Sequence, residues 1–61
     1  MNDEQKQQMI KQRLAQYEQQ VLSLEMDKVA LLAVEDTEGV KVIDTRIEAI
    51  RKAMTAVEGM M

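Results

Sequence analysis

The side chains that could carry out chemistry in this chain are hydroxyls and carboxylates, because its 61 residues include no His and no Cys. The hydroxyls belong to Tyr17, Ser23, Thr37, Thr45 and Thr55. A hydroxyl nucleophile needs a base beside it, and no Gly-rich segment is present to hold a phosphate. We therefore expect no enzymatic activity, no catalytic residues and no bound cofactor.

An acidic cluster, Glu35, Asp36 and Glu38, is the one group of carboxylates that lie close together in the sequence. It could bind a divalent cation or a basic partner, but the ligand pattern of a calcium-binding loop is absent. Acidic residues also keep loops soluble and compensate the dipole at the start of a helix. We favour this structural role and expect no metal site.

Three cations near the N-terminus, Lys6, Lys11 and Arg13, lie among glutamines. Lys and Arg contact phosphates and Gln can bond to polar edges, so this segment is the candidate for binding RNA. The net charge of −3 argues against strong electrostatic binding to nucleic acid or to an anionic membrane. Nucleic-acid binding is therefore kept as the alternative function.

Long helices must position these residues, because the chain has no Pro, Phe or Trp and only two Gly. A first apolar row steps by four and three residues, which is the heptad spacing of a helix that packs on another helix. Its members are Ile10, Leu14, Tyr17, Val21, Leu24, Lys28 and Leu31. This row predicts a helix over about residues 4–34, begun by a cap at Asn2 or Asp3.

Lys28 is the one polar residue in this row. Its stem could cover apolar surface while the ammonium reaches water, or the ammonium could pair with Asp44 across to a second helix. A functional buried amine is the alternative reading. We expect the structural role, with Asp44 as the partner.

A second heptad row follows a break at residues 35–39 and predicts a helix over about residues 37–58, with a tail at 59–61. Its members are Val40, Ile43, Ile47, Ile50, Met54, Val57 and Met61. Asp36 or Thr37 should cap it, although Thr45 and Glu48 offer a rival start. Gly59 should end it in a left-handed turn that folds Met60 back on Met54.

The predicted fold is therefore all-α: a single two-helix antiparallel hairpin over residues 1–61, with a loop at about 35–37. Folding about this loop pairs residues whose numbers sum to the low seventies. The first helix should then extend past the second by about two to three turns. Met9, Ile10, Leu14 and Tyr17 on this extension are the candidate contacts for a partner protein.

Another apolar row, Leu22, Met26, Val29 and Ala33, lies roughly opposite the first row on the same helix. One partner helix cannot cover both rows, and a chain this short buries little surface alone. We expect self-association, most simply an antiparallel dimer that makes a four-helix bundle, or a higher helical assembly. The expected interface residues are Val21, Leu22, Leu24, Met26, Val29, Leu32, Ala33, Val42, Ala49, Ala53 and Ala56.

These patterns predict a small non-enzymatic structural or interaction protein, such as an adaptor, assembly factor or inhibitor-like accessory protein. Its expected partners are further copies of itself and a larger protein. The longest apolar run, residues 29–34, is far short of the about 20 residues that span a membrane. We therefore expect a soluble, cytoplasmic protein, or a component of a larger assembly such as a virion if a phage encodes it. The style of the chain suggests a phage or bacterial source.

Overall fold

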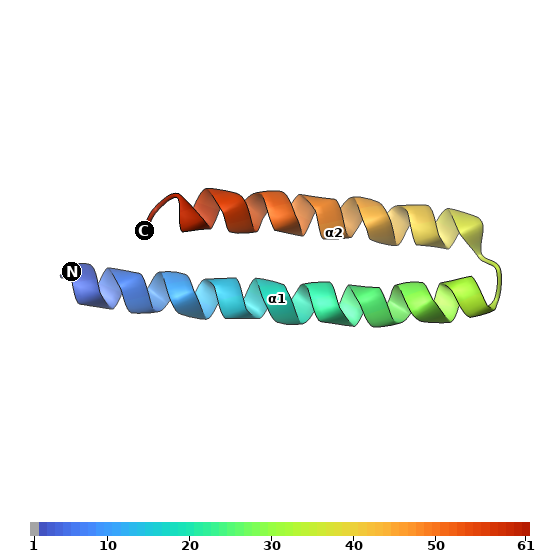
Figure 1. Ribbon diagram of the computed structural model, residues 1–61, viewed down its shortest axis with the longest axis horizontal. Helices are drawn as coiled ribbons and strands as arrows, with labels where there is room; N and C mark the ends of the chain where they lie inside the picture. Colours follow the sequence, from blue (N-terminus) through green and yellow to red (C-terminus); the bar gives the residue numbers. More distant parts are fainter. Residues whose placement is uncertain (1) are drawn as a thin grey trace.

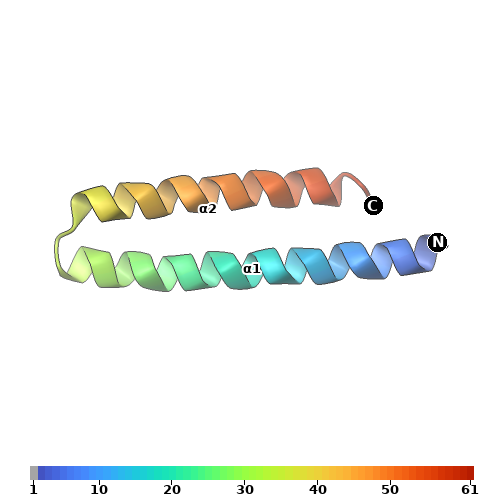
Figure 2. The same ribbon diagram turned by 180° about the vertical axis from the view of Figure 1, so that it is seen from behind.

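The computed structural model describes residues 2–61 and consists of two long antiparallel helices joined by a tight loop (Figures 1 and 2). Helix α1 spans Asp3–Ala33 and helix α2 spans Thr37–Glu58. The described residues contain no strand, and the rod they form measures 49 × 15 × 10 Å. The prediction of an all-helical, two-helix hairpin is confirmed. The helix bounds lie within one residue of those expected from the heptad rows.

Helix α1 begins at a side-chain cap. The Oδ1 atom of Asn2 accepts a hydrogen bond from the backbone N–H of Gln5 at 2.8 Å. This bond satisfies one of the first-turn donors that have no partner within the helix. Asp3 and Glu4 follow in the first turn, where negative charge interacts favourably with the helix dipole.

Helix α1 ends in a left-handed turn. The sequence had led us to expect such a turn at Gly59, at the end of α2. Glu35 has φ 59°, and the N–H groups of Glu35 and Asp36 donate to the carbonyls of Leu32 and Leu31 at 3.1 and 2.9 Å. This is the Schellman arrangement, which reverses the chain while satisfying the last carbonyls of the helix. For a residue with a Cβ this conformation is less stable by about 1–2 kcal/mol, so glycine is the usual residue at this position.

Gly59 does not adopt a left-handed conformation, and the expectation for it was wrong. Its φ and ψ are −63° and −12°, in the right-handed region. Met60 and Met61 instead donate to the carbonyls of Val57 and Glu58 at 3.0 and 3.1 Å. These i to i−3 bonds satisfy the last carbonyls of α2, so no left-handed residue is required there.

Helix α2 begins at Asp36, whose Oδ1 atom accepts a hydrogen bond from the N–H of Gly39 at 2.9 Å. The expected cap at Asp36 is confirmed, and the rival start at Thr45 was wrong because Val40 and Ile43 are already helical. Gly39 permits a close approach at this point. A Cβ there would lie 2.6 Å from Oδ2 of Asp36 and 3.1 Å from Cδ1 of Leu31.

The core is a single seam between the two helices. Ile10, Ile43 and Ile47 are the buried residues, and the other members of the two heptad rows are half-buried or, at Met61, exposed. A two-helix hairpin can shield only the row that faces its partner helix. The described part of the chain consequently has a thin core and leaves several large apolar side chains in water.

The coverage of Ile10 differs from expectation. We expected α2 to end before it could cover Ile10, yet Ile10 is the most buried residue, with 5% of its surface exposed. The turn at residues 59–61 continues beyond α2, and the C-terminal end lies beside the first part of α1 (Figures 1 and 2). Helix α1 still extends past the end of α2, and the residues that follow α2 lie beside part of this extension (Figures 1 and 2).

Candidate interaction surface

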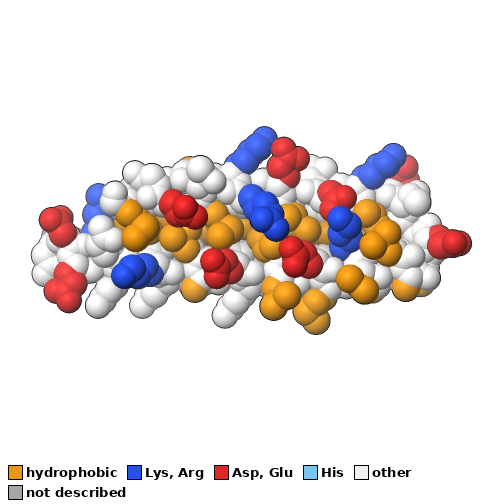
Figure 3. Space-filling view, in the orientation of Figure 1, with side chains coloured by type: hydrophobic (Ala, Val, Ile, Leu, Met, Phe, Trp, Pro, Cys, Tyr) orange, Lys and Arg blue, Asp and Glu red, His pale blue; other side chains and the backbone are white. Residues whose placement is uncertain are grey.

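The hairpin has one charged flank, where ion pairs join the two helices beside the seam. Nζ of Lys28 lies 2.8 Å from Oδ1 of Asp44, which confirms the predicted pair. Arg51 lies 3.4 Å from Glu25 and donates a hydrogen bond to it. Asp44 and Arg51 are seven residues apart and share a face of α2. In Figure 3, acidic and basic side chains border the apolar seam along much of its length.

These ion pairs contribute little to stability. The side chains of Lys28 and Asp44 are 37% and 50% exposed, so water screens their attraction. Pairs of this kind contribute about 0–1 kcal/mol. Glu25 and Arg51, which the sequence analysis did not pair, are similarly exposed. Both pairs join α1 to α2 and are consistent with the register in which the two helices pack.

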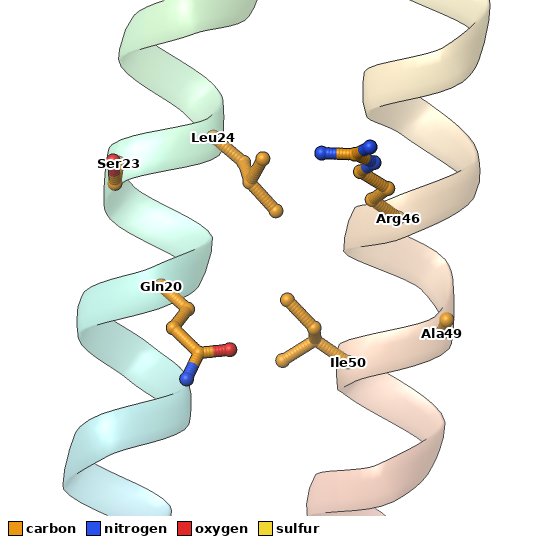
Figure 4. Close-up of a pocket in the computed structure, with 6 residues that line it drawn as sticks. All are labelled: Gln20, Ser23, Leu24, Arg46, Ala49 and Ile50. Carbon is orange, nitrogen blue, oxygen red and sulfur yellow. The ribbon is translucent and has the colours of Figure 1, made fainter.

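An open groove runs along the opposite flank of the seam, with a volume of about 430 Å³ (Figure 4). Leu24 and Ile50 point toward each other across it, and Gln20 and Arg46 reach in from the two helices. Ser23 and Ala49 leave it wide because their side chains are small. The groove contains one cation and no carboxylate, and it stays open to water. It therefore lacks the paired groups that acid–base chemistry requires.

The outer face of α1 is turned away from α2. It carries large apolar side chains that are strongly exposed although they lie in the middle of the helix and not at its ends. Leu22, Met26 and Val29 are 58%, 65% and 67% exposed, and Ala33 is exposed as well. We call these four residues the outer row. Their spacing of four, three and four residues places them on one helix face. In Figure 3, apolar side chains project along the edge of α1 that faces away from α2, in the half nearer to the loop.

The other expected interface residues divide between the seam and the surface. Val21 and Leu24 are half-buried members of the seam within the hairpin. Leu32 and Val42 are exposed, at 55% and 54%. Among the small residues expected at the interface along α2, Ala49 and Ala56 are exposed and Ala53 is half-buried. Of these residues, Leu32, Val42, Ala49 and Ala56 are exposed and can meet another molecule.

The predicted partner contacts near the N-terminus do not form one surface. Met9 is 58% exposed, whereas Leu14 and Tyr17 are half-buried and Ile10 is buried against the end of the hairpin. Ile10 therefore cannot anchor a partner without opening the seam. Of the four, Met9 is the residue left fully available for contact.

The three cations considered for RNA do not form a continuous strip either. Lys6, Lys11 and Arg13 are all exposed, and none forms an ion pair with another described residue. Lys6 and Arg13 are seven residues apart and share a face. Lys11 precedes Arg13 by two residues, so it lies about 200° around the helix, on the other side. A phosphate backbone following one side of α1 would therefore meet two of these charges.

Several polar side chains of the loop and of α2 interact with groups in the same helix. Asp36 caps α2, and Glu38 lies 3.5 Å from Lys41. The hydroxyls of Thr45 and Thr55 donate to backbone carbonyls one turn earlier, at 3.0 and 3.1 Å. Within residues 2–61 no group of three or more acidic side chains is arranged to hold a metal ion.

Comparison with known proteins adds no relative: no family model, curated protein or solved structure matches this chain. Neither helix is sufficiently long and apolar to cross a membrane, as far as the described residues extend. Any account of function must therefore come from the surfaces of the hairpin itself.

Proposed function

We propose that this protein is a small non-enzymatic interaction protein, an adaptor, assembly factor or inhibitor-like accessory protein, that acts through its helix faces as an oligomer. The observation that carries this proposal is the exposure of the outer row. Three large apolar side chains, Leu22, Met26 and Val29, each keep more than half of their surface in water. A contiguous exposed apolar patch on a small protein is typical of a surface that another molecule covers.

The thin core gives independent support. A chain of about 60 residues buries a modest fraction of its surface on folding, and such chains usually depend on a disulfide, a metal or association. This chain has no Cys and no His. Association is the device that remains, and the outer row is the surface with the chemistry to supply it.

The groups available for chemistry support a non-enzymatic role. The threonine hydroxyls of α2 at positions 45 and 55 donate to backbone carbonyls, and the groove at Leu24 and Ile50 holds no carboxylate. A nucleophile without a base, in a site that water enters freely, has little means of activation. The surface of the helices is therefore the part of the molecule that we propose to be active.

The test is the molar mass of the protein in solution, measured by light scattering after gel filtration. We expect an oligomer for the natural chain and a monomer for the double variant Leu22→Glu with Val29→Glu, because two buried carboxylates would have no partners. Thr45→Glu with Thr55→Glu adds the same charge to exposed positions on α2 and should leave the oligomer intact. A natural chain that is a folded monomer at about 100 µM, which corresponds to association weaker than about 5–6 kcal/mol, would contradict the proposal.

A further inference from the structure

We propose that the molecule covering the outer face of α1 is a second copy of this chain, packed antiparallel so that the two α1 helices lie at the centre of the dimer. This inference rests on the proposed function and adds to it the identity of the occupant and the register. It commits to a specific set of facing residues, so it can fail even if the protein associates.

The spacing of exposed residues on this face is symmetric. Six of them step by four, three, four, three and four residues, and all are exposed: Ala15, Gln19, Leu22, Met26, Val29 and Ala33. Because this spacing reads the same in both directions, an antiparallel copy can place the face against itself about a two-fold axis. Facing residues then have numbers that sum to about 48, since the axis passes the helix near residue 24.

This register matches side chains of complementary size and character. Leu22 faces Met26 of the second copy, which brings the largest exposed side chains of the face together at the centre. Ala15 faces Ala33 of the second copy, so the helices can approach closely at both ends of the contact. Gln19 lies over Val29, with its amide free to reach water at the edge.

Charge favours the same arrangement. Lys11 is exposed one turn before Ala15 on this face. In the antiparallel register it lies beside the acidic loop, Glu35 and Asp36, of the second copy, where opposite charges attract. A parallel arrangement would instead bring the two acidic loops together, with like charges adjacent. Glu25 approaches its own symmetry mate near the axis, but each copy is already paired with its Arg51 at 3.4 Å.

The length of the contact favours this register over the one displaced by a heptad toward the loop. The pairing of apolar side chains favours it over the longer overlap displaced toward the N-terminus, where Leu22 would face Gln19. Residues 15–33 of the two copies overlap over about 28 Å of helix at 1.5 Å per residue. Sliding one copy by a heptad, so that Leu22 faces Ala33, would shorten the overlap to about 18 Å because α1 ends at Ala33. A single pair of helices in contact over about 28 Å is at the small end of stable interfaces, so we expect a dissociation constant in the micromolar range.

A disulfide experiment tests the register, and the absence of natural Cys makes it unambiguous. The double variant Ala15→Cys with Ala33→Cys is oxidised at high concentration, digested and mapped by mass spectrometry. We expect links between position 15 of one chain and position 33 of another. These positions are about 27 Å apart within one helix, so such a link cannot form inside a chain. Thr45→Cys with Thr55→Cys, on exposed positions of α2, should stay unlinked.

Links joining position 15 to 15 and 33 to 33 would show a parallel dimer and overturn the proposal. A protein that is dimeric by mass but gives no 15-to-33 link would overturn it as well, while leaving the proposed function standing. A monomeric natural chain would contradict both. Circular dichroism on the reduced variant establishes that the exchange of alanine for cysteine leaves the helices formed.

A charge exchange provides a second, independent readout. Lys11→Glu should weaken dimerisation by about threefold to fivefold at low salt, as expected for the loss of two exposed ion pairs, one on each side of the two-fold axis. Adding Glu35→Lys should restore it. The two positions are about 36 Å apart along the chain, so a direct charge contact between them forms only between copies. Glu35→Lys alone provides the baseline for its effect at the end of α1. An unchanged dissociation constant for Lys11→Glu, or no restoration by the second change, would overturn the proposed packing.

Discussion

At the scale of the residue, the least favourable backbone conformation in the described chain belongs to Glu35. It is the described non-glycine residue with positive φ, at 59°, and it supplies the left-handed turn that ends α1. Its carboxylate also lies at the C-terminal end of a helix that has no basic residue in its last turn. Negative charge at this end of a helix is unfavourable. Its backbone conformation therefore works against the stability of the hairpin, whereas its charge is unfavourable at the end of α1 and favourable at the start of α2.

Replacing this residue by glycine should stabilise the protein. Glu35→Gly removes the steric cost of the left-handed conformation, and we expect the free energy of unfolding to rise by about 1 kcal/mol. Urea denaturation followed by circular dichroism measures the change. Glu35→Gln is the matched control, because it removes the charge but keeps the Cβ. A gain from Gln as large as that from Gly would show that the backbone conformation costs little here.

The two neighbours Met9 and Ile10 make a second comparison at this scale. Ile10 is 5% exposed and Met9 is 58% exposed, although they are adjacent in α1. Ile10→Ala should lower the free energy of unfolding by about 2 kcal/mol or more, since it leaves a cavity in the seam. Met9→Ala should change it by less than about 0.5 kcal/mol. Equal losses in the two variants, measured by denaturation at one protein concentration, would mean that residues 59–61 do not cover Ile10 in solution.

At the scale of the element, much of the hairpin was predictable because its determinants are local. Heptad spacing marked both helices, and the short polar side chains of Asn2 and Asp36 marked the caps that the structure contains. The pair of Lys28 with Asp44 followed from one polar residue in an apolar row facing a second helix. Each of these inferences needed only the period of a helix and the direction of the chain.

What escaped prediction depends on the details of close contacts and chain ends. The left-handed turn was assigned to Gly59 because glycine prefers it, yet the reversal after α1 imposes it on Glu35 instead. The burial of Ile10 was missed because the prediction ended the cover at α2, although the heptad row continues to Met61 and the turn after α2 carries residues 60 and 61 onward. The exposure of the outer row was inferred from the sequence. What covers that row is a property of the assembly, which the pattern of one chain does not specify.

At the scale of the whole molecule, the faces of the hairpin differ in chemical character. One flank of the seam carries the ion pairs Lys28–Asp44 and Glu25–Arg51, which align α1 with α2. The outer row on α1 is apolar and exposed, at Leu22, Met26 and Val29. One face of α1 therefore packs against α2 in the core, and the opposite face of the same helix is exposed. In the proposed oligomer α1 is covered on both faces, so folding is linked to association and the stability of the hairpin should depend on its concentration.

The midpoint of thermal unfolding as a function of protein concentration tests this central claim most directly. A folded state that is an oligomer gains stability by mass action, so a hundredfold increase in concentration should raise the midpoint by about 5–10 °C for a chain of this size. Circular dichroism at 222 nm, a wavelength that reports helix, follows the transition, and the variant Leu22→Glu with Val29→Glu should lose the dependence. A natural chain that unfolds cooperatively at the same temperature over the whole range would contradict the account.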